Sequence, residues 1–428
     1  MTSLKIGVAG LGTVGISVLK ILEDNKATIR NRAGSAIEVV GVTARNKNAK
    51  RPMDISAYTW FDDAQDMVAH CDVLVELIGG SDGIAYKLVK EALSKGVSVV
   101  TANKAMIAHH GLELATLAEE NNCNLMFEAA VAGAVPIVNA IRHSFTSDKI
   151  TGVHGILNGT SNYILTQMRE TGRDFADVLK DAQDKGYAEA DPTFDIEGVD
   201  AGHKVAILAA LAFGTQPDFS GVHMTGISSL TEEDFHFAGE LGFKIKLLGS
   251  AEMHDDRVLQ IVEPCFIPDG SPFAAIEDAY NAVYCECEYA ETPLMSGLGA
   301  GGDATASSVV GDIVALARGE SAPVFGVPVS SLKKVGSFDP REVESRYYIR
   351  FNVKDKVGVM ADISAILRDH GISIETMIQL GRSPEQNVNV VMVTHDALRE
   401  DVNTASDLIS RLDVIFGEPC IIRIEEDF

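Results

Sequence analysis

The sequence predicts an α/β protein that begins with a doubly wound parallel sheet of the Rossmann type. Three observations predict this class. Strand and helix patterns alternate through the first 135 residues, a glycine-rich turn joins the first strand to the first helix, and the last 80 or so residues follow the order βαββαβ. Alternating strands and helices form parallel sheets, and the βαββαβ order is ferredoxin-like. Between these two units we expect an α+β region that supplies substrate binding and dimerisation.

A buried strand is predicted over residues 4–9, followed at once by Gly10-Leu-Gly-Thr-Val-Gly15 and a helix over 16–23. Gly10 and Gly12 let the chain turn and approach a pyrophosphate, and Gly15 lets the helix pack on the strand. Thr13 and Val14 lie at the helix N-terminus, which would face the phosphates. The turn therefore predicts a dinucleotide site; a tight turn without a ligand is the alternative.

The later elements of this unit continue the alternation. We expect strands over 37–43, 72–78, 97–101 and 124–128, and helices over 84–94 and 112–121. No acid ends the second strand, where one would bind the ribose of NAD, and Arg45 could instead accept a 2′-phosphate. NADP(H) is therefore preferred and NAD(H) possible, although a surface arginine without this role is equally open.

Lys104 ends the motif Thr101-Ala-Asn-Lys104, just past a strand. Ligands bind beyond the carboxyl ends of strands in such sheets. Lys104 is therefore predicted to touch cofactor or substrate, with a solvated loop lysine as the alternative.

The segment 185–204 is rich in acids and precedes an apolar helix expected over 199–213. Asp200 and Lys204 stand four residues apart and share a helical face. That pairing can hold an ammonium as a proton donor to a carbonyl oxygen, and nearby carboxylates suit an amino-acid ammonium. A solvated ion pair is the alternative. The six acids are Asp184, Glu189, Asp191, Asp195, Glu197 and Asp200.

These signals divide the chain into residues 1–135 (nucleotide binding), 136–319 (substrate and dimerisation), 320–345 (a proline-containing linker) and 346–428 (regulation). In the second division we expect strands over 244–250, 258–265 and 282–289. A glycine-rich stretch then opens a helix over 303–319 that returns to the first division. Glycine-rich backbone at a helix start offers N–H groups to an anion or to a nicotinamide.

The amino-acid composition argues against two classes of binding partner. A net charge of −25 argues against nucleic acid and anionic membranes as partners. The six cysteines lack metal-binding spacing, and no signal peptide or apolar run of spanning length is evident. We expect a cytoplasmic protein with buried free thiols. His203 is interpreted as a packing residue beside Lys204.

Together the motifs resemble those of homoserine dehydrogenases, of the single-function kind with a C-terminal ACT domain. The matching segments are Gly10–Gly15, Thr101–Lys104, Phe127–Gly133, Leu157–Tyr163, Gly186–Lys204 and Gly301–Ser307. The tail matches the ACT pattern more loosely, in its strand order and its Asp355-Lys-Val-Gly358 loop. No aspartokinase domain is present, so kinase activity is not expected.

The resemblance implies reversible NAD(P)-dependent reduction of L-aspartate 4-semialdehyde to L-homoserine, in threonine, methionine and isoleucine biosynthesis. It implies Lys204 as proton donor, with Lys104 beside the nicotinamide and substrate. It implies Glu189, Asp195 and Asp200 as substrate-binding residues, and Gly186 and Gly301 as cofactor contacts. A monovalent cation, Na⁺ or K⁺, would be held by Glu128 and the carbonyls of Val131, Gly133 and Val135.

The resemblance also implies a homodimer or homotetramer and an amino-acid effector, for which L-threonine is the candidate. Two alternatives remain at this point. One is a non-enzymatic sensor of NADP(H) and an amino acid, and the other is a different amino-acid-linked dehydrogenase. A sensor would not need a proton donor beside the nicotinamide.

Overall fold

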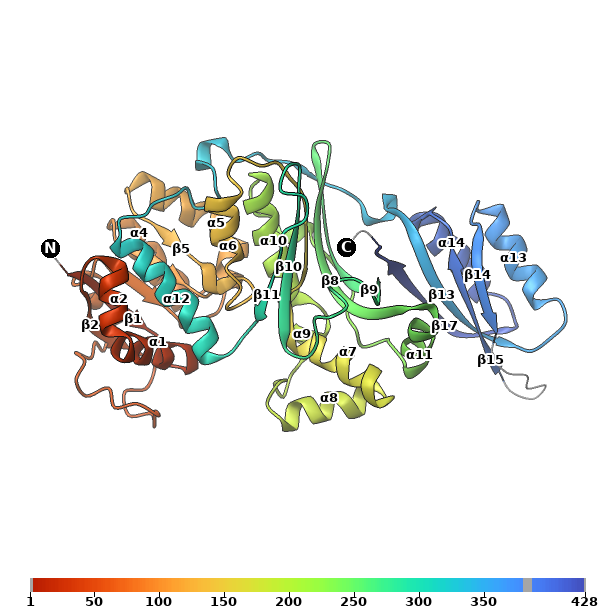
Figure 1. The fold of residues 1–428 in the computed structure, drawn as a ribbon, viewed down its shortest axis with the longest axis horizontal. Helices are drawn as coiled ribbons and strands as arrows, with labels where there is room; N and C mark the ends of the chain where they lie inside the picture. Colours follow the sequence, from red (N-terminus) through yellow and green to blue (C-terminus); the bar gives the residue numbers. More distant parts are fainter. Residues whose placement is uncertain (1–2, 380–386, 427–428) are drawn as a thin grey trace.

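The computed structural model describes residues 3–379 and 387–426. Figure 1 shows an elongated molecule with three regions in a row: an N-terminal parallel-sheet unit, a central region of long strands, and a C-terminal unit at the opposite end. The predicted fold class is confirmed. No helix among the described residues is long and apolar enough to cross a membrane.

The N-terminal region is a five-stranded parallel sheet in the order β2-β1-β3-β4-β5. Its strands are β1 (Leu4–Ala9), β2 (Ile37–Thr43), β3 (Val73–Glu76), β4 (Ser98–Thr101) and β5 (Leu125–Met126). Its helices are α1 (Thr13–Asp24), α2 (Lys26–Ala33), α3 (Ala64–Val68), α4 (Ile84–Ser94) and α5 (Lys104–Glu120). The chain reverses its direction of winding between β1 and β3, where sheets of this class bind ligands.

Helix α5 begins well before the predicted helix over 112–121. Gly111, which interrupts the apolar pattern in the sequence, lies inside this helix, and a Cβ there would stand 2.8 Å from the ring of Phe325. The glycine therefore makes room for Phe325 and does not end a helix. As a result Lys104 occupies the first position of α5, where the Asn103 side chain accepts a hydrogen bond from the Met106 N–H at 3.2 Å.

Helix α12 (Gly302–Ala317) returns to the N-terminal region and packs against α1. Its Val309 and Ile313 are buried in one cluster with Ile6 and Val8 of β1. A Cβ at Gly302 would lie 2.8 Å from Cγ2 of Thr13, so glycine permits this close approach. Helix α12 therefore packs on the N-terminal region.

The central region is built on antiparallel strands in the order β11-β10-β6-β8-β9. Its strands are β6 (Ile150–Ile156), β7 (His223–Met224), β8 (Phe243–His254), β9 (Arg257–Pro268), β10 (Tyr280–Cys287) and β11 (Leu294–Leu298). Its helices are α6 (Ile137–Asn139), α7 (Gly159–Thr171), α8 (Phe175–Asp184), α9 (Thr193–Ile196), α10 (Val199–Phe213) and α11 (Glu232–Leu241). Helix α10 packs on this sheet and on α5, and it is buried from Asp200 to Leu211.

The C-terminal unit has the expected βαββαβ order, with one short extra strand. Its elements are β13 (Glu344–Lys354), α13 (Val359–Asp369), β14 (Ile374–Gln379), β15 (Asn387–Thr394), β16 (Ala397–Leu398), α14 (Arg399–Ser410) and β17 (Ile415–Ile424). The strand order β17-β13-β15-β14 is that of a ferredoxin-like sheet. The last residue of the strand predicted over 373–380 lies outside the described residues.

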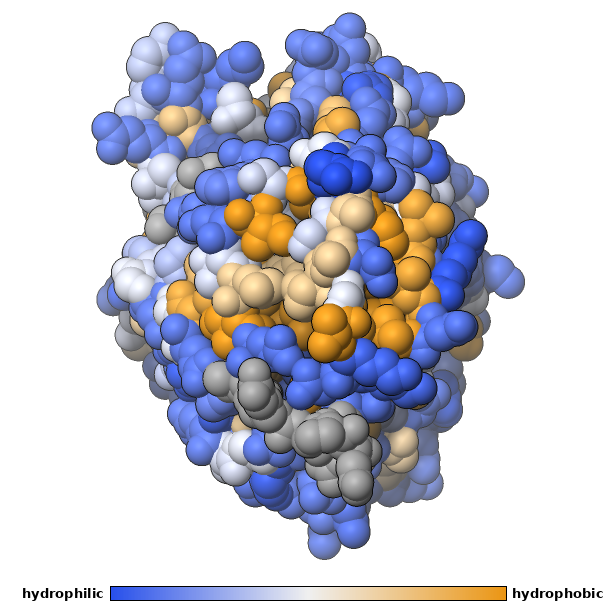
Figure 2. All heavy atoms as spheres, turned by 90° about the vertical axis from the view of Figure 1, so that its right-hand side faces the viewer, coloured by the Kyte–Doolittle hydropathy of each residue, from blue (hydrophilic) through white to orange (hydrophobic). Residues whose placement is uncertain are grey.

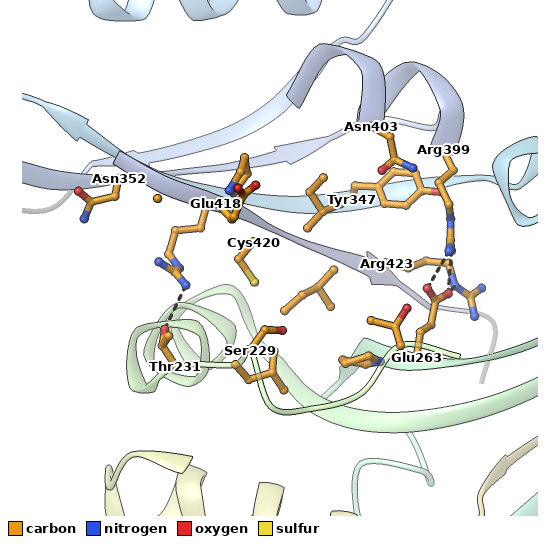
Figure 3. A pocket seen from close by; sticks show the side chains of 18 of the residues that line it. Ser229, Thr231, Glu263, Tyr347, Asn352, Arg399, Asn403, Glu418, Cys420 and Arg423 are labelled. Atoms are coloured by element: carbon orange, nitrogen blue, oxygen red, sulfur yellow. Dashed lines mark hydrogen bonds and ion pairs between the residues drawn. The ribbon is translucent and has the colours of Figure 1, made fainter. Parts of the chain in front are cut away.

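The C-terminal sheet continues the central sheet, although the sequence suggested a separate unit. Strand β17 pairs in parallel with β9, through Arg423 opposite Cys265 and Ile424 opposite Phe266. Figure 3 shows the cavity of about 620 Å³ at this junction and the ion pairs on its wall. Glu263 of β9 accepts hydrogen bonds from Arg399 at 2.7 and 2.8 Å and from Arg423 at 2.8 Å.

A second set of contacts ties β13 to helix α11. Asp234 accepts hydrogen bonds from the Tyr348 hydroxyl at 3.1 Å and from Arg350 Nε at 2.7 Å. Asp234 is fully buried, and the Arg350 guanidinium holds the pKa of this carboxyl below its usual value despite burial, which acts in the opposite direction. The C-terminal unit is therefore fixed to the central region by both a sheet and buried ion pairs.

The proline-containing segment 320–345 packs along the molecule. It contains the short strand β12 (Gly336–Ser337), which pairs with β9, and its Phe325 and Phe338 are buried. Two single helical turns lie at Val329–Ser331 and Pro340–Glu342. The domain boundaries at residues 135, 319 and 345 stay predictions.

Candidate active site

The glycine turn after β1 has the geometry that a dinucleotide needs. Gly10 has φ of 105°, and a Cβ there would lie 2.4 Å from the Leu77 carbonyl oxygen. A Cβ at Gly15 would lie 2.0 Å from the carbonyl oxygen of Gly10. These two glycines let strand, turn and helix approach closely. A Cβ at Gly12 would meet nothing within 4 Å, which leaves open space over the backbone. The residues present therefore fit a bound pyrophosphate at the start of α1.

Arg45 is exposed and follows the end of β2 by two residues. Two further cations lie near this strand end: Lys47 and Arg51 each lie 5.8 Å from the Trp60 ring centroid. The end of β2 is therefore basic and carries no carboxylate at residues 43–51.

A cavity of about 840 Å³ lies between the N-terminal and central regions. It is lined by residues from the α1, α5, α7 and α10 starts and from the glycine-rich stretch before α12. Predicted site residues on its wall are Val14, Lys104, Gly133, Gly186, Asp195, Asp200, Lys204 and Gly301. Segments almost 290 residues apart in sequence thus meet at one cavity.

One carboxylate joins the two predicted lysines. Asp200 Oδ1 lies 2.8 Å from Lys104 Nζ, and its Oδ2 lies 2.7 Å from Lys204 Nζ. Lys204 Nζ also donates to the Leu157 carbonyl at 2.5 Å. The side chain of Lys104 is 32% exposed and that of Lys204 only 8%, so Lys204 is the more enclosed of the two.

The surroundings shift the pKa values of Asp200, Lys204 and Lys104 in different ways. Burial alone would raise the pKa of Asp200, but the two ammonium groups outweigh it and hold that pKa well below its usual range. Burial lowers the pKa of Lys204, and the positive charge of Lys104 adds to this, while Asp200 opposes both. For Lys104, burial is outweighed by Asp200, and its pKa is raised. Lys204 is therefore the more acidic of the two ammonium groups.

Asn158 organises the carboxylates of the cavity, and sequence reasoning assigned it no role. Its Nδ2 donates to Asp195 Oδ1 and to Asp200 Oδ2, both at 2.8 Å, while its Oδ1 accepts from the Ser161 N–H at 2.7 Å and caps α7. Burial raises the pKa of Asp195, and Asn158 opposes this. The motif containing Asn158 was recognised, but its partners lie about 40 residues away in sequence.

Two further observations concern the acid-rich segment. Tyr187 lines the cavity and stacks on Tyr163 with ring centroids 4.4 Å apart, a contact that the sequence did not suggest. Glu189 is exposed and is not on the cavity wall; its carbonyl accepts from Gln183 Nε2 at 3.0 Å. The structure therefore brings Asp195 and Asp200 to the lysines but not Glu189.

Glu76 is a fully buried carboxylate at the end of β3 that the sequence analysis missed. It accepts from the Ile78 N–H at 2.7 Å, the Gly79 N–H at 3.1 Å and the Thr101 hydroxyl at 2.6 Å. Thr101 in turn accepts from the Asn103 N–H at 3.0 Å. This series of hydrogen bonds joins the ends of β3 and β4 and fixes the backbone immediately before Lys104.

The predicted cation ligands lie in one turn between β5 and α6. Glu128 accepts from the Val138 and Asn139 N–H groups at 3.0 and 2.7 Å, the Gly133 carbonyl from Ser308 at 2.8 Å, and the Val135 carbonyl from Ile137 at 2.8 Å. Each oxygen retains a further lone pair, so an all-oxygen site remains chemically compatible with a cation. Among residues 3–379 and 387–426, no cluster of three or more His, Cys, Asp or Glu could hold a metal ion.

Family models match three parts of the chain. A homoserine dehydrogenase NAD-binding domain matches residues 10–128, the homoserine dehydrogenase model matches residues 136–314, and an ACT domain matches residues 347–413. These spans follow the three regions of the fold.

Relatives match over the full length. The chain is 41% identical to a homoserine dehydrogenase of Pseudomonas aeruginosa over 100% of both chains, and 40% identical to that of Neisseria gonorrhoeae over 99% of both. A crystal structure of a homoserine dehydrogenase from Thiobacillus denitrificans superimposes with a TM-score of 0.93 at 39% identity, covering 100% of this chain and 99% of that one. The glycine turn, the lysine-bearing cavity and these full-length matches agree: the chain belongs to the homoserine dehydrogenase family.

Proposed function

We propose that the chain interconverts L-aspartate 4-semialdehyde and L-homoserine with a nicotinamide dinucleotide, and that Lys204 exchanges the proton. The observation that carries this proposal is the Lys104–Asp200–Lys204 cluster, with Nζ–Oδ distances of 2.8 and 2.7 Å, on the wall of the cavity next to the glycine turn. The family match supports the reaction. The roles of individual residues are our own assignment.

A bound nicotinamide would supply or accept the hydride, and the protein's residues manage the resulting charge. In the reducing direction Lys104 and Lys204 polarise the aldehyde oxygen, and Lys204 Nζ gives a proton to the alkoxide. Asp200 keeps both ammonium groups in position. The cluster of one carboxylate and two ammonium groups carries a net positive charge, which stabilises the developing negative oxygen.

The carboxylates of the cavity suit the substrate's α-ammonium. Burial raises the pKa of Asp195, so a bound cation would offset the cost of keeping that carboxylate charged. Asp195 and Asp200 are therefore assigned to the substrate. Glu189 is assigned to the same task, which requires its exposed segment to move towards the cavity when substrate binds.

NADP(H) is the proposed preferred cofactor, with NAD(H) possible. Exposed Arg45 and the neighbouring Lys47 and Arg51 support this choice, because a 2′-phosphate needs cations at the end of β2. Gly10, Gly12, Thr13, Val14 and Gly15 would hold the pyrophosphate side, and Gly186 and Gly301 the nicotinamide side. A hyperthermophilic archaeal homoserine dehydrogenase has been solved in complex with NADPH, and it matches 73% of this chain at 26% identity with a TM-score of 0.63.

A monovalent cation, Na⁺ or K⁺, is proposed at Glu128 with the carbonyls of Val131, Gly133 and Val135. Burial and the nearby Asp312 carboxylate raise the pKa of Glu128 to about 7, which indicates that the buried Arg142 compensates these acids only in part. A cation there would supply the missing charge.

An amino-acid effector, L-threonine, is proposed at the Asp355–Gly358 loop of the C-terminal unit. Gly358 has φ of 101° and precedes helix α13, whose N-terminus could face a carboxylate. Val357 beside it is fully exposed.

Self-association as a homodimer or homotetramer is proposed through the C-terminal unit and the central strands. Figure 2 shows a hydrophobic patch on the outer face of this end of the molecule. Strand β14 lies at the end of the sheet and exposes Met377 at 50%. A free edge beside exposed apolar side chains favours pairing with a second copy.

All six cysteines are free in the structure, which supports the proposed reducing cytoplasm.

The reaction is tested by following reduction of NADP⁺ with L-homoserine and, separately, with L-serine, L-threonine, L-aspartate and L-glutamate. Turnover with homoserine at least tenfold above the others is expected. Equal or better turnover with another amino acid would establish a different dehydrogenase. Binding of NADP⁺ without turnover of any of them would leave the chain as a sensor.

A further inference from the structure

Catalysis requires a route for protons to the buried lysine. Each aldehyde reduced consumes one proton, so Lys204 must be reprotonated after every turnover. Its side chain, however, is only 8% exposed. The cavity in front of it is the one that substrate and nicotinamide would occupy. Once both are bound, proton entry has to come from another side.

A second cavity, of about 540 Å³, meets the first at Lys104. Ala102 and Lys104 line both cavities. The second cavity is otherwise bounded by the Gly79–Ser81 turn and by an aromatic and histidine cluster consisting of His109, Phe194, His203 and Phe219. It has room for several water molecules, because one occupies about 30 Å³ in the liquid.

Two imidazoles span this cavity from its mouth to its interior. His109 of α5 is exposed, whereas His203 of α10 is 3% exposed, and their Nε2 atoms lie 3.3 Å apart. His203 stacks on Phe219 with ring centroids 4.2 Å apart, and its Nδ1 is buried with no hydrogen-bond partner within the described residues. A buried nitrogen without a partner is costly unless water or a transient partner meets it.

Burial, together with the nearby positive charges, favours the neutral form of His203. The groups that act on it are His109 and Lys104 from α5 and Asp200 and Lys204 from its own helix. Burial lowers the pKa of His203 to about 4, with His109 and Lys104 adding to this. A neutral imidazole has one N–H and one free nitrogen, so it can accept a proton on one side and release one on the other.

We propose that the second cavity is the proton entrance of the enzyme, with His109 and His203 as the relay and Lys104 as its inner end. This inference rests on the proposed reaction. A proton taken from solvent by His109 passes to His203 Nε2, leaves from Nδ1 through water in the cavity, and reaches Lys104. Lys104 shares Asp200 with Lys204, at 2.8 and 2.7 Å, and this bridge passes the proton to the donor.

The balance is one proton in for each aldehyde reduced and one out for each alcohol oxidised, with the nicotinamide as the only redox partner. The sequence suggested only a packing role for His203, and the proposed relay gives it a second role. His109 and His203 are positioned as relays and do not touch the reacting atoms.

The test uses the intact protein and the variants His109→Asn and His203→Asn. The matched control is His110→Asn, because His110 is the next residue on α5 but bonds Asp82 at 2.9 Å and does not line the cavity. Phe219→Leu is a second control that disturbs the stacking on His203 without removing a proton carrier. For each protein, kcat of aldehyde reduction is measured in H₂O and D₂O across a range of imidazole concentrations.

The relay variants should lose roughly tenfold in kcat, equivalent to a barrier increase of about 1.4 kcal/mol. KM should change by less than about threefold, the solvent isotope effect should rise, and added imidazole should restore turnover. The two controls should show neither a larger isotope effect nor rescue. Because His109 is exposed, His109→Asn remains informative if His203→Asn fails to fold. Unchanged kcat in His109→Asn, or a loss insensitive to imidazole and D₂O, overturns the proposal while leaving the homoserine reaction itself intact.

Discussion

Asp200 serves two lysines with one buried carboxylate, and this explains how two adjacent ammonium groups coexist. Asp200 and Lys204 are four residues apart on α10, and Lys104 comes from the start of α5. The shared carboxylate raises the pKa of Lys104 above its ordinary value, while burial and the charge of Lys104 leave that of Lys204 lowered. Lys104 is therefore the more basic of the two ammonium groups and Lys204 the more acidic one.

This arrangement predicts the pH dependence of the Asp200→Asn variant. On the proposed role of Lys204, reduction needs the protonated lysine, so the rate of reduction is complete below the Lys204 pKa and is lost as pH rises through it. Asp200 raises that pKa, so its removal should move the alkaline limb of kcat to lower pH. Homoserine oxidation, which needs neutral Lys204, should shift in the same direction and begin at lower pH. The control is Asp191→Asn, because Asp191 is exposed and, among the described residues, accepts hydrogen bonds only from Thr193, from its N–H at 3.2 Å and its hydroxyl at 2.7 Å. A limb that moves upward, or equally in both variants, contradicts the assignment.

Cofactor choice provides a second prediction at this scale. Arg45→Ala should raise KM for NADPH more than KM for NADH, because only NADPH carries the 2′-phosphate. The ratio of the two KM values, measured at fixed semialdehyde concentration, is the readout. Arg30→Ala is a suitable control, because Arg30 is exposed on α2, away from the end of β2. Equal changes for both cofactors would show that Arg45 does not contact the phosphate.

Much of the site could be predicted residue by residue, but its connections could not. Lys104 and Lys204 are marked by their motifs, and both line the cavity. Asn158 and Glu76 were missed because their importance depends on partners brought together only by the fold. The exposed position of Glu189 was equally invisible, because a loop's distance from a cavity has no local sequence signal.

At the scale of elements, strands and amphipathic helices followed their sequence patterns closely. Helix α4 and helix α10 have the predicted bounds, and the five N-terminal strands lie within two residues of expectation at each end. Helix α5 was predicted to begin only at residue 112, and the close approach of Phe325 that Gly111 permits inside this helix has no signal in the local sequence. The pairing of β17 with β9 was not predictable, because parallel pairing of distant strands depends on tertiary packing.

The junction of β9 with the C-terminal unit predicts an unequal response to two similar substitutions. Glu263→Gln leaves Arg399 and Arg423 without their shared carboxylate in a buried setting, and should lower the free energy of unfolding by about 3–5 kcal/mol. Glu342→Gln, the control, breaks the exposed pair with Arg257 and should cost about 0–1 kcal/mol. Urea unfolding of both variants gives the comparison. Losses of similar size would mean that the junction pairs do not stabilise the fold.

At the scale of the whole molecule, the proposed effector loop and the glycine turn lie at opposite ends. The continuous sheet through β9 and β17 offers the physical connection between the C-terminal unit and the central region. Truncation after Ser345 would remove this pairing as well as the effector loop. Substitutions in the full chain are therefore the sharper test of regulation.

Threonine should inhibit the wild-type enzyme with a coupling of about 1–3 kcal/mol, or about 5–150-fold in affinity. Gly358→Ala should abolish that response, because φ of 101° and the approach of a ligand both require glycine. The control is Gly371→Ala, which also places an alanine at a positive φ, of 73°, near the other end of α13. The rate of homoserine oxidation is measured against threonine concentration for the wild type and both variants. No inhibition or calorimetric binding up to millimolar threonine in the wild type excludes threonine as the effector.

Turnover of the Lys204→Met protein is the most direct test of how the assembled molecule works. Methionine keeps most of the length of the buried side chain but removes its ammonium, and Lys180→Met, on the exposed face of α8, is the control. With circular dichroism confirming that both variants fold, Lys204→Met should lose roughly 10²–10⁴-fold in kcat for homoserine oxidation. Lys180→Met should stay close to wild type. Near-normal turnover of a folded Lys204→Met protein would contradict the assignment of Lys204 as the proton donor.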